Sequence, residues 1–128
     1  MYQVIIVDDE PRILEGIIHL FPWNNFGFEV VASFTNGKEA LEYINAHPQV
    51  DIVMTDIQMP VMNGLEATRR IRESARDDLR ALPVVVLSAN AFTEDVQESK
   101  RAGADDHLSK PISVKDLAAT LGGILGRA

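Results

Sequence analysis

The chain has 128 residues, no cysteine and a formal net charge of −7 at pH 7. Its length suits one domain over residues 1–128, and its 46% hydrophobic and 24% charged content excludes a disordered chain. The lack of cysteine excludes disulfide scaffolds, thiolate metal sites and thiol catalysis. The acidic balance argues against direct binding of nucleic acid or of an anionic membrane, because phosphate groups require a basic surface. With no basic leader and no membrane-spanning apolar run, we expect a cytoplasmic protein.

Short apolar runs alternate with helical patterns along the chain. The runs predict strands at residues 3–7, 29–34, 52–56, 83–87 and 106–108. Apolar residues at helical spacing predict helices at about 11–20, around 40–44, and at 63–74, 93–102 and 114–125. Residues 23–28 are expected to form an aromatic-rich connection, and residues 76–80 a charged connector. This alternation predicts an α/β fold with a doubly wound parallel sheet, for which we expect the flavodoxin-like (βα)5 strand order 2-1-3-4-5.

Polar residues follow four of the five predicted strands. Asp8 and Asp9 follow the first, Asp56 ends the third, Ser88 follows the fourth and Lys110 follows the fifth. Because the carboxyl ends of parallel strands share one edge of a sheet, these residues are expected to converge there. Strands one and three would flank the crevice at the point where the strand order reverses, and the three aspartates would line it.

Three carboxylates in one crevice repel each other, and a hard divalent cation such as Mg²⁺ relieves that repulsion while leaving room for phosphate oxygens. An ammonium and a hydroxyl on the same rim can bind the remaining oxygens of a phosphoryl group. The set predicts Mg²⁺-assisted phosphoryl transfer with an aspartate nucleophile. Taken singly, Asp9 reads as a helix cap, Ser88 as a turn residue and Lys110 as a solvated charge. Their coincidence at the strand ends favours a site.

Three motifs carry a resemblance to a known family: VDDEP from Val7, TDIQMPVMNG from Thr55 and LSKPI from Leu108. With them the whole chain resembles the receiver domain of bacterial two-component response regulators. The resemblance implies that a histidine kinase or histidine phosphotransfer protein phosphorylates Asp56. It also implies that Mg²⁺ binds Asp9 and Asp56 directly and Asp8 through water.

The same resemblance assigns further positions. The backbone carbonyl of Gln58 would complete the metal ligands, and Gln58 and Asn90 would tune hydrolysis. Lys110 would bind the phosphoryl group and Ser88 would be the switch hydroxyl. The switching surface would comprise the helix at 93–102, the fifth strand and the last helix, and a phosphorylation-linked homodimer is an expected partner state. His107 stands where many receivers carry Tyr or Phe, and we hypothesise that it adds pH sensitivity.

The two halves resemble different receivers. The first, with LFPWNNFGFEVVASFTNGKEAL, resembles those of regulators with AraC-type DNA-binding domains, and the second, with LSANAFTEDVQESKRAGADDHLSKPI, resembles those of hybrid histidine kinases. A recombined or engineered chain would explain this, and so would natural divergence.

A receiver would be a self-phosphorylating and self-dephosphorylating switch and not a turnover enzyme. Two other functions also remain open. One is a Mg²⁺-dependent phosphatase of the haloacid-dehalogenase type, whose nucleophile follows strand one in a DxD pattern that Asp8, Asp9 and Glu10 do not match. The other is a receiver-like interaction module that needs no phosphate, against which the complete set of site residues argues.

Overall fold

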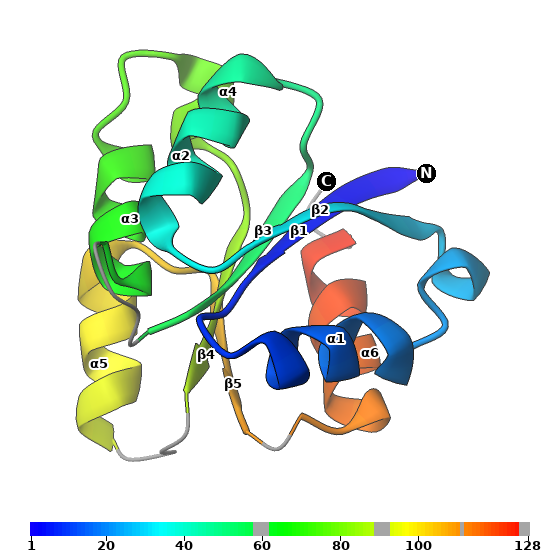
Figure 1. Ribbon diagram of the computed structural model, residues 1–128. Helices are drawn as coiled ribbons and strands as arrows, with labels where there is room; N and C mark the ends of the chain where they lie inside the picture. The colour runs from blue at the N-terminus through cyan, green and yellow to red at the C-terminus, as the bar shows by residue number, and fades with distance from the viewer. Residues whose placement is uncertain (58–61, 89–92, 111, 126–128) are drawn as a thin grey trace.

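The apolar runs form one five-stranded parallel sheet in the order β2-β1-β3-β4-β5, as predicted (Figure 1). The computed structural model describes residues 1–57, 62–88, 93–110 and 112–125. The strands are β1 (Tyr2–Val7), β2 (Phe28–Phe34), β3 (Ile52–Asp56), β4 (Val84–Ser88) and β5 (Asp106–Ser109). All four neighbouring pairs run parallel, so every carboxyl end lies on the same edge of the sheet.

Helices cover both faces of the sheet. They are α1 (Pro11–Leu20), α2 (Gly37–Ala46), α3 (Gly64–Arg72), α4 (Asp77–Arg80), α5 (Thr93–Ala102) and α6 (Val114–Leu125), with a 3₁₀ helix η1 (Trp23–Phe26). In Figure 1, α1 and α6 lie on one side of the sheet and α2, α3 and α5 on the other. No helix in the described ranges is long and apolar enough to cross a bilayer.

Two connections are more regular than the sequence pattern predicts. Residues 76–80 were expected to be a charged connector, but they contain the short helix α4, because Leu79 is buried there against the sheet face and anchors the turn. The aromatic connection after α1 forms η1, in which Trp23 is buried while Phe26 stays 49% exposed. Among the described residues there are therefore six α-helices where five were expected.

The core consists of two apolar layers, one on each face of the sheet. One layer packs strand residues such as Ile6 and Met54 against α1 and α6, and the other packs residues such as Val53 and Val86 against α2, α3 and α4. Every residue of β3 and β4 is buried, which explains their unbroken apolar runs.

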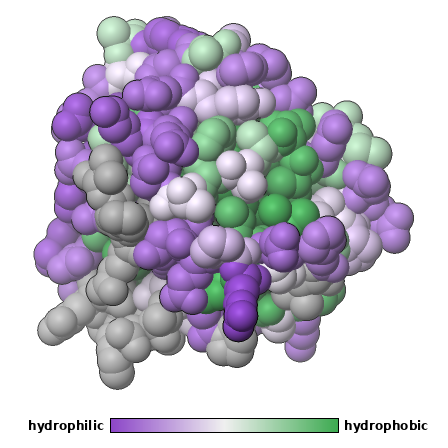
Figure 2. All heavy atoms as spheres, in the orientation of Figure 1, coloured by the Kyte–Doolittle hydropathy of each residue, from purple (hydrophilic) through white to green (hydrophobic). Residues whose placement is uncertain are grey.

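The edge strand β2 is less completely covered than the central strands. Val30, Val31 and Ala32 are only half-buried, and hydrophobic residues gather over this strand in the space-filling view (Figure 2). The buried strands β1, β3 and β4 therefore form the rigid support for the carboxyl-end edge, where the polar residues lie.

Candidate functional site

Asp8 and Asp9 directly follow the buried strand β1. The backbone N–H of Asp8 donates to the carbonyl oxygen of Phe34 at 3.0 Å, which continues the pairing with β2. The side chain of Asp8 is fully buried, and its Oδ1 accepts a hydrogen bond from the N–H of Glu10 at 3.0 Å. Asp9 is exposed. The end of β1 thus presents one buried and one accessible carboxylate.

Asp56 is the last residue of β3, the neighbour of β1 in the sheet. Its side chain is almost buried, at 12% relative exposure, and its Oδ1 accepts a hydrogen bond from the N–H of Ile57 at 3.0 Å. The same N–H also donates a hydrogen bond to the carbonyl oxygen of Leu87 on β4, at 3.0 Å. These contacts fix the orientation of the Asp56 carboxylate at the sheet edge.

Lys110 follows β5 and reaches both buried acids. Its backbone N–H donates to the carbonyl oxygen of Ser88 at 2.7 Å, which anchors the residue at the end of β4. Its Nζ donates to Asp8 Oδ2 at 2.6 Å and lies 3.3 Å from Asp56 Oδ1. One ammonium therefore bridges two carboxylates that come from neighbouring strands.

The three aspartates form a donor set suited to a divalent cation. Asp8, Asp9 and Asp56 each offer a carboxylate oxygen, and these atoms all lie within 4.8 Å of one another. The single ammonium of Lys110 leaves the cluster with an excess of negative charge. Because hard carboxylate oxygens are the ligands that Mg²⁺ prefers, the residues present fit this ion.

The electrostatics of the cluster shift two pKa values. Burial raises the pKa of the Asp56 carboxyl above its usual value, and the charge of Asp8 adds to this, while Lys110 and the Ile57 N–H act in the opposite direction. Burial alone would lower the pKa of Lys110. The hydrogen bond from Lys110 to Asp8 and the charges of Asp56 and Asp8 outweigh burial, so the pKa of Lys110 is raised and the ammonium stays charged.

Of the other predicted site residues, the structure describes Ser88 and His107. Ser88 is buried at the end of β4, where its carbonyl receives the Lys110 N–H, so it lies at the same edge as the acids. His107 lies within β5 and lines a hollow of about 260 Å³ with residues of α5 such as Val96 and Lys100. The predicted positions Gln58 and Asn90 lie outside the described residues.

Sequence reasoning missed that two Asn-Gly pairs cap the starts of helices and that Gly64 lies against the backbone of Asp56. Asn36 and Asn63 each precede a glycine and cap a helix, accepting hydrogen bonds from the N–H of the glutamates three residues later at 2.9 and 2.8 Å. A Cβ at Gly64 would lie 2.1 Å from the carbonyl oxygen of Asp56. An Asn-Gly pair by itself is typical of a turn, yet here the same pair starts both α2 and α3.

Comparisons with known proteins agree with this geometry. The family model described as the response regulator receiver domain matches residues 4–122. The chain is 32% identical over 125 residues to the response regulator MprA of Mycolicibacterium vanbaalenii, covering 98% of this chain and 51% of that protein. It is 31% identical over 121 residues to the uncharacterized transcriptional regulatory protein YesN of Bacillus subtilis, covering 94% of this chain and 32% of that protein. The chain thus spans about half of the first relative's length and about a third of the second's.

Solved structures give the same result. The receiver domain of AraT, a response regulator from Geobacillus stearothermophilus, superposes with a TM-score of 0.85 and 34% identity, over 98% of this chain and 94% of that one. A chain of the CheX-CheY-BeF3-Mg²⁺ complex from Borrelia burgdorferi superposes with a TM-score of 0.85 and 25% identity, over 97% and 89%. Each match runs through both halves of the chain, so the mixed resemblance of the halves stays an untested prediction.

Proposed function

Because this chain belongs to the response regulator receiver domain family, we propose that it accepts a phosphoryl group on the carboxylate of Asp56. The observation that carries the proposal is the contact of Lys110 Nζ with both Asp8 and Asp56, beside the exposed Asp9. This arrangement puts a fixed positive charge where the oxygens of an incoming phosphoryl group need one. The family match disfavours a haloacid-dehalogenase phosphatase.

Mg²⁺ is the cofactor that the acidic cluster fits. Asp9 and Asp56 would bind it directly, the backbone carbonyl of Gln58 would complete the protein ligands, and Asp8 would act through water. When bound, the ion neutralises negative charge that develops on the phosphoryl oxygens. The similar CheX-CheY complex from Borrelia burgdorferi contains Mg²⁺ and BeF3, which supports the assignment.

The transfer uses residues of this chain in three ways. An oxygen of the Asp56 carboxylate attacks phosphorus as the P–N bond to the donor histidine breaks. The electron pair returns to the imidazole, and Asp56 becomes an acyl phosphate. Lys110 binds a phosphoryl oxygen, and the Ile57 N–H holds the carboxylate in position. Hydrolysis by water later cleaves the acyl phosphate, at a rate that the side chains at Gln58 and Asn90 would tune.

The phosphoryl group then acts as a switch. Ser88 would donate its hydroxyl to a phosphoryl oxygen, and His107 would respond on the same face of the sheet. The surface that changes comprises α5, β5 and α6. We expect the domain to be a signalling switch and not a turnover enzyme.

Receivers of this family interact with histidine kinases or histidine phosphotransfer proteins, and we assign the same class of donor to this chain. Its net charge of −7 argues that this domain binds neither nucleic acid nor an anionic membrane directly. A phosphorylation-linked homodimer is part of the proposal. We also propose that residues 1–128 hold a single receiver domain, which the family match over residues 4–122 supports.

Intact mass after incubation with acetyl phosphate tests the proposal. We expect one phosphoryl adduct in the presence of Mg²⁺, and none in its absence or in Asp56→Ala. The matched control is Asp51→Ala, because Asp51 lies just before the same strand, at its other end, and accepts the N–H of Gln3 at 2.7 Å. An adduct that persists in folded Asp56→Ala would contradict the assignment. A folded protein that is never modified by acetyl phosphate or by a kinase would favour the phosphate-independent module.

A further inference from the structure

The turn at residues 34–37, which joins β2 to α2, contacts both of the segments that carry the site acids. The carbonyl oxygen of Phe34 accepts the N–H of Asp8 at 3.0 Å. The N–H of Gly37 donates to the carbonyl oxygen of Met62 at 3.0 Å, and Met62 lies in the connection that follows Asp56. The 34–37 turn therefore bridges the end of β1 and the end of the loop after β3.

Gly64, two residues after Met62, contacts both Ile57 and Asp56 at the end of β3. The N–H of Gly64 donates to the carbonyl oxygen of Ile57 at 2.9 Å. Gly64 is so close to Asp56 that a Cβ there would lie 2.1 Å from the Asp56 carbonyl oxygen and 2.9 Å from its carbonyl carbon. Because Met62 lies two residues before Gly64, a displacement of Met62 would press Gly64 against the backbone of Asp56.

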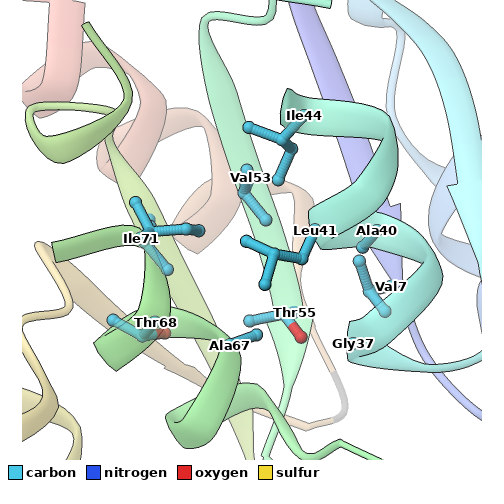
Figure 3. Close-up of a pocket in the computed structure, with 11 residues that line it drawn as sticks. Val7, Gly37, Ala40, Leu41, Ile44, Val53, Thr55, Ala67, Thr68 and Ile71 are labelled. Atoms are coloured by element: carbon cyan, nitrogen blue, oxygen red, sulfur yellow. The ribbon is translucent and has the colours of Figure 1, made fainter. Parts of the chain in front are cut away.

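Gly37 leaves no room for a side chain at the point where the turn meets the loop. A Cβ at Gly37 would lie 2.6 Å from the Met62 carbonyl oxygen and 3.2 Å from the Cβ of Ala67. Gly37, Ala67 and Thr55 line a small cavity (Figure 3). Its volume of about 10 Å³ is just enough for one water molecule. Since this cavity cannot accept a displaced backbone, a larger residue at position 37 would push against Met62.

β1 and β3 are paired directly as far as Val7 and Thr55. We infer that the 34–37 turn positions the segments that continue beyond this pairing, with Asp8, Asp9 and Asp56, and that Gly37 is a positioning residue for Mg²⁺ binding. The inference rests on the proposed function for the identity of the cation. Groups that orient metal ligands without touching the metal typically change metal affinity by about 10- to 100-fold when they are altered. Gly37→Ala is therefore expected to weaken Mg²⁺ binding about tenfold.

The test compares wild type, Gly37→Ala and Gly16→Ala by calorimetric titration with Mg²⁺ alone. Gly16 is the matched control, because it lies on the exposed side of α1 and a Cβ there would meet nothing within 4 Å. Thermal unfolding without metal is measured for each protein. The inference expects a higher Kd for Mg²⁺ in Gly37→Ala only. A Gly37→Ala protein that melts earlier but binds Mg²⁺ with the wild-type Kd would overturn it, since that is the signature of a merely structural residue.

A double variant separates the two contacts that a side chain at position 37 would make. Gly37→Ala with Ala67→Gly removes the contact with the Ala67 Cβ but not the collision with the Met62 carbonyl. We expect Mg²⁺ binding to remain weak in this protein. Recovery of the wild-type Kd would show that the contact with Ala67, and not the collision with Met62, weakens Mg²⁺ binding, and would contradict the inference.

Amide hydrogen exchange in the metal-free protein tests the inference without relying on Mg²⁺ binding, so its failure can be told apart from a failure of the proposed function. The N–H groups of Ile57 and Gly64 should exchange faster in Gly37→Ala and at the wild-type rate in Gly16→Ala, whether or not Mg²⁺ binds at all. If Gly37→Ala does not fold, Asn36→Ala is used instead, because it removes the cap on the Glu39 N–H and loosens the same turn. Unchanged exchange at Ile57 and Gly64 in the folded variant would overturn the inference.

Discussion

The Nζ atom of Lys110 lies 2.6 Å from Oδ2 of Asp8, a carboxylate with no exposed surface. The two residues come from opposite ends of the chain, and Lys110 is itself only 16% exposed. A buried carboxylate depends on such a partner, because the free energy of removing its charge from water is recovered only through a close, hydrogen-bonded cation.

Replacement of Lys110 by Met should therefore destabilise the metal-free protein strongly. Leaving one member of a buried ion pair without its partner costs about 3 kcal/mol or more in unfolding free energy. Urea unfolding in the presence of a chelator measures this loss, with Lys115→Met, at an exposed position of α6, as the control. Added Mg²⁺ should stabilise Lys110→Met more than wild type, because the cluster without the ammonium is more negative. Equal stabilisation of both proteins would contradict this account of the cluster.

The raised pKa of Asp56 predicts how stability varies with pH. A folded-state pKa above the ordinary value of 3.8 means that the folded protein binds this proton more tightly than the unfolded chain. The contribution of Asp56 to stability therefore falls as the pH rises from about that ordinary value through the higher folded value.

Asp56→Asn removes this unfavourable charge. We expect the variant to be more stable than metal-free wild type at pH 7 by about 1 kcal/mol, a usual size for a stabilising substitution. The advantage should shrink as the pH is lowered below the folded pKa of Asp56, where the wild-type carboxyl is neutral as well. Thermal unfolding of both proteins over a pH series with a chelator tests the prediction. A variant that is less stable than wild type at neutral pH would show that Asp56 is held favourably as the charged form.

Arg72 forms hydrogen bonds at the amino-terminal ends of β4 and β5, on the side of the sheet away from the acidic cluster. Its guanidinium donates to the carbonyl oxygens of Gly103, Arg80 and Leu82 at 2.8, 3.0 and 2.6 Å, and to Asp105 Oδ2 at 2.7 Å. These acceptors lie at the end of α4 or in the connections that lead from α4 to β4 and from α5 to β5, so one side chain joins several elements.

Arg72→Met should lower the unfolding free energy by about 3 kcal/mol, since hydrogen bonds from a charged group contribute about 1.5–3 kcal/mol each and water replaces part of them. Arg70→Met on the same helix is the control. Arg70 makes an exposed ion pair with Glu66, and such pairs are worth less than about 1 kcal/mol. Similar losses in the two variants, measured by urea unfolding, would show that the Arg72 contacts contribute little.

His107 carries a buried nitrogen without a partner. Among the described residues, its Nε2 is the buried side-chain polar atom that has no hydrogen-bond partner. His107→Phe should therefore raise the unfolding free energy by about 1 kcal/mol, because an unsatisfied buried polar atom costs about 1–3 kcal/mol. His19→Phe, at an exposed position of α1, should have little effect. Destabilisation by His107→Phe would indicate that the nitrogen is satisfied in solution. The pH sensitivity expected from His107 stays a prediction.

Much of the site could be predicted because one rule places it. Apolar runs identify the strands, parallel strands share an edge, and the residues after the runs must meet there, as Asp8, Asp56 and Lys110 do. The alternating pattern also predicted a doubly wound parallel sheet, and the flavodoxin-like strand order expected for it is confirmed. These features depend on local sequence and on topology alone.

The remaining features depend on contacts between residues far apart in the chain. Arg72 reads as one of several arginines on α3, and only the fold reveals that it meets Gly103 and Leu82. Gly37 reads as a turn residue until Met62 is seen against it. The helix α4 was missed because its four residues are too short for a periodic pattern, and only burial of Leu79 identifies it.

Chemical location of the phosphoryl group tests the central claim most directly. Borohydride reduces an aspartyl phosphate to homoserine and releases phosphate, so the modified residue can be read from peptide masses. After incubation with acetyl phosphate and Mg²⁺, we expect homoserine at position 56 and at no other aspartate. Homoserine at position 8 or 9, with position 56 unmodified, would contradict the account and would restore a phosphatase-like nucleophile after β1 as the better explanation.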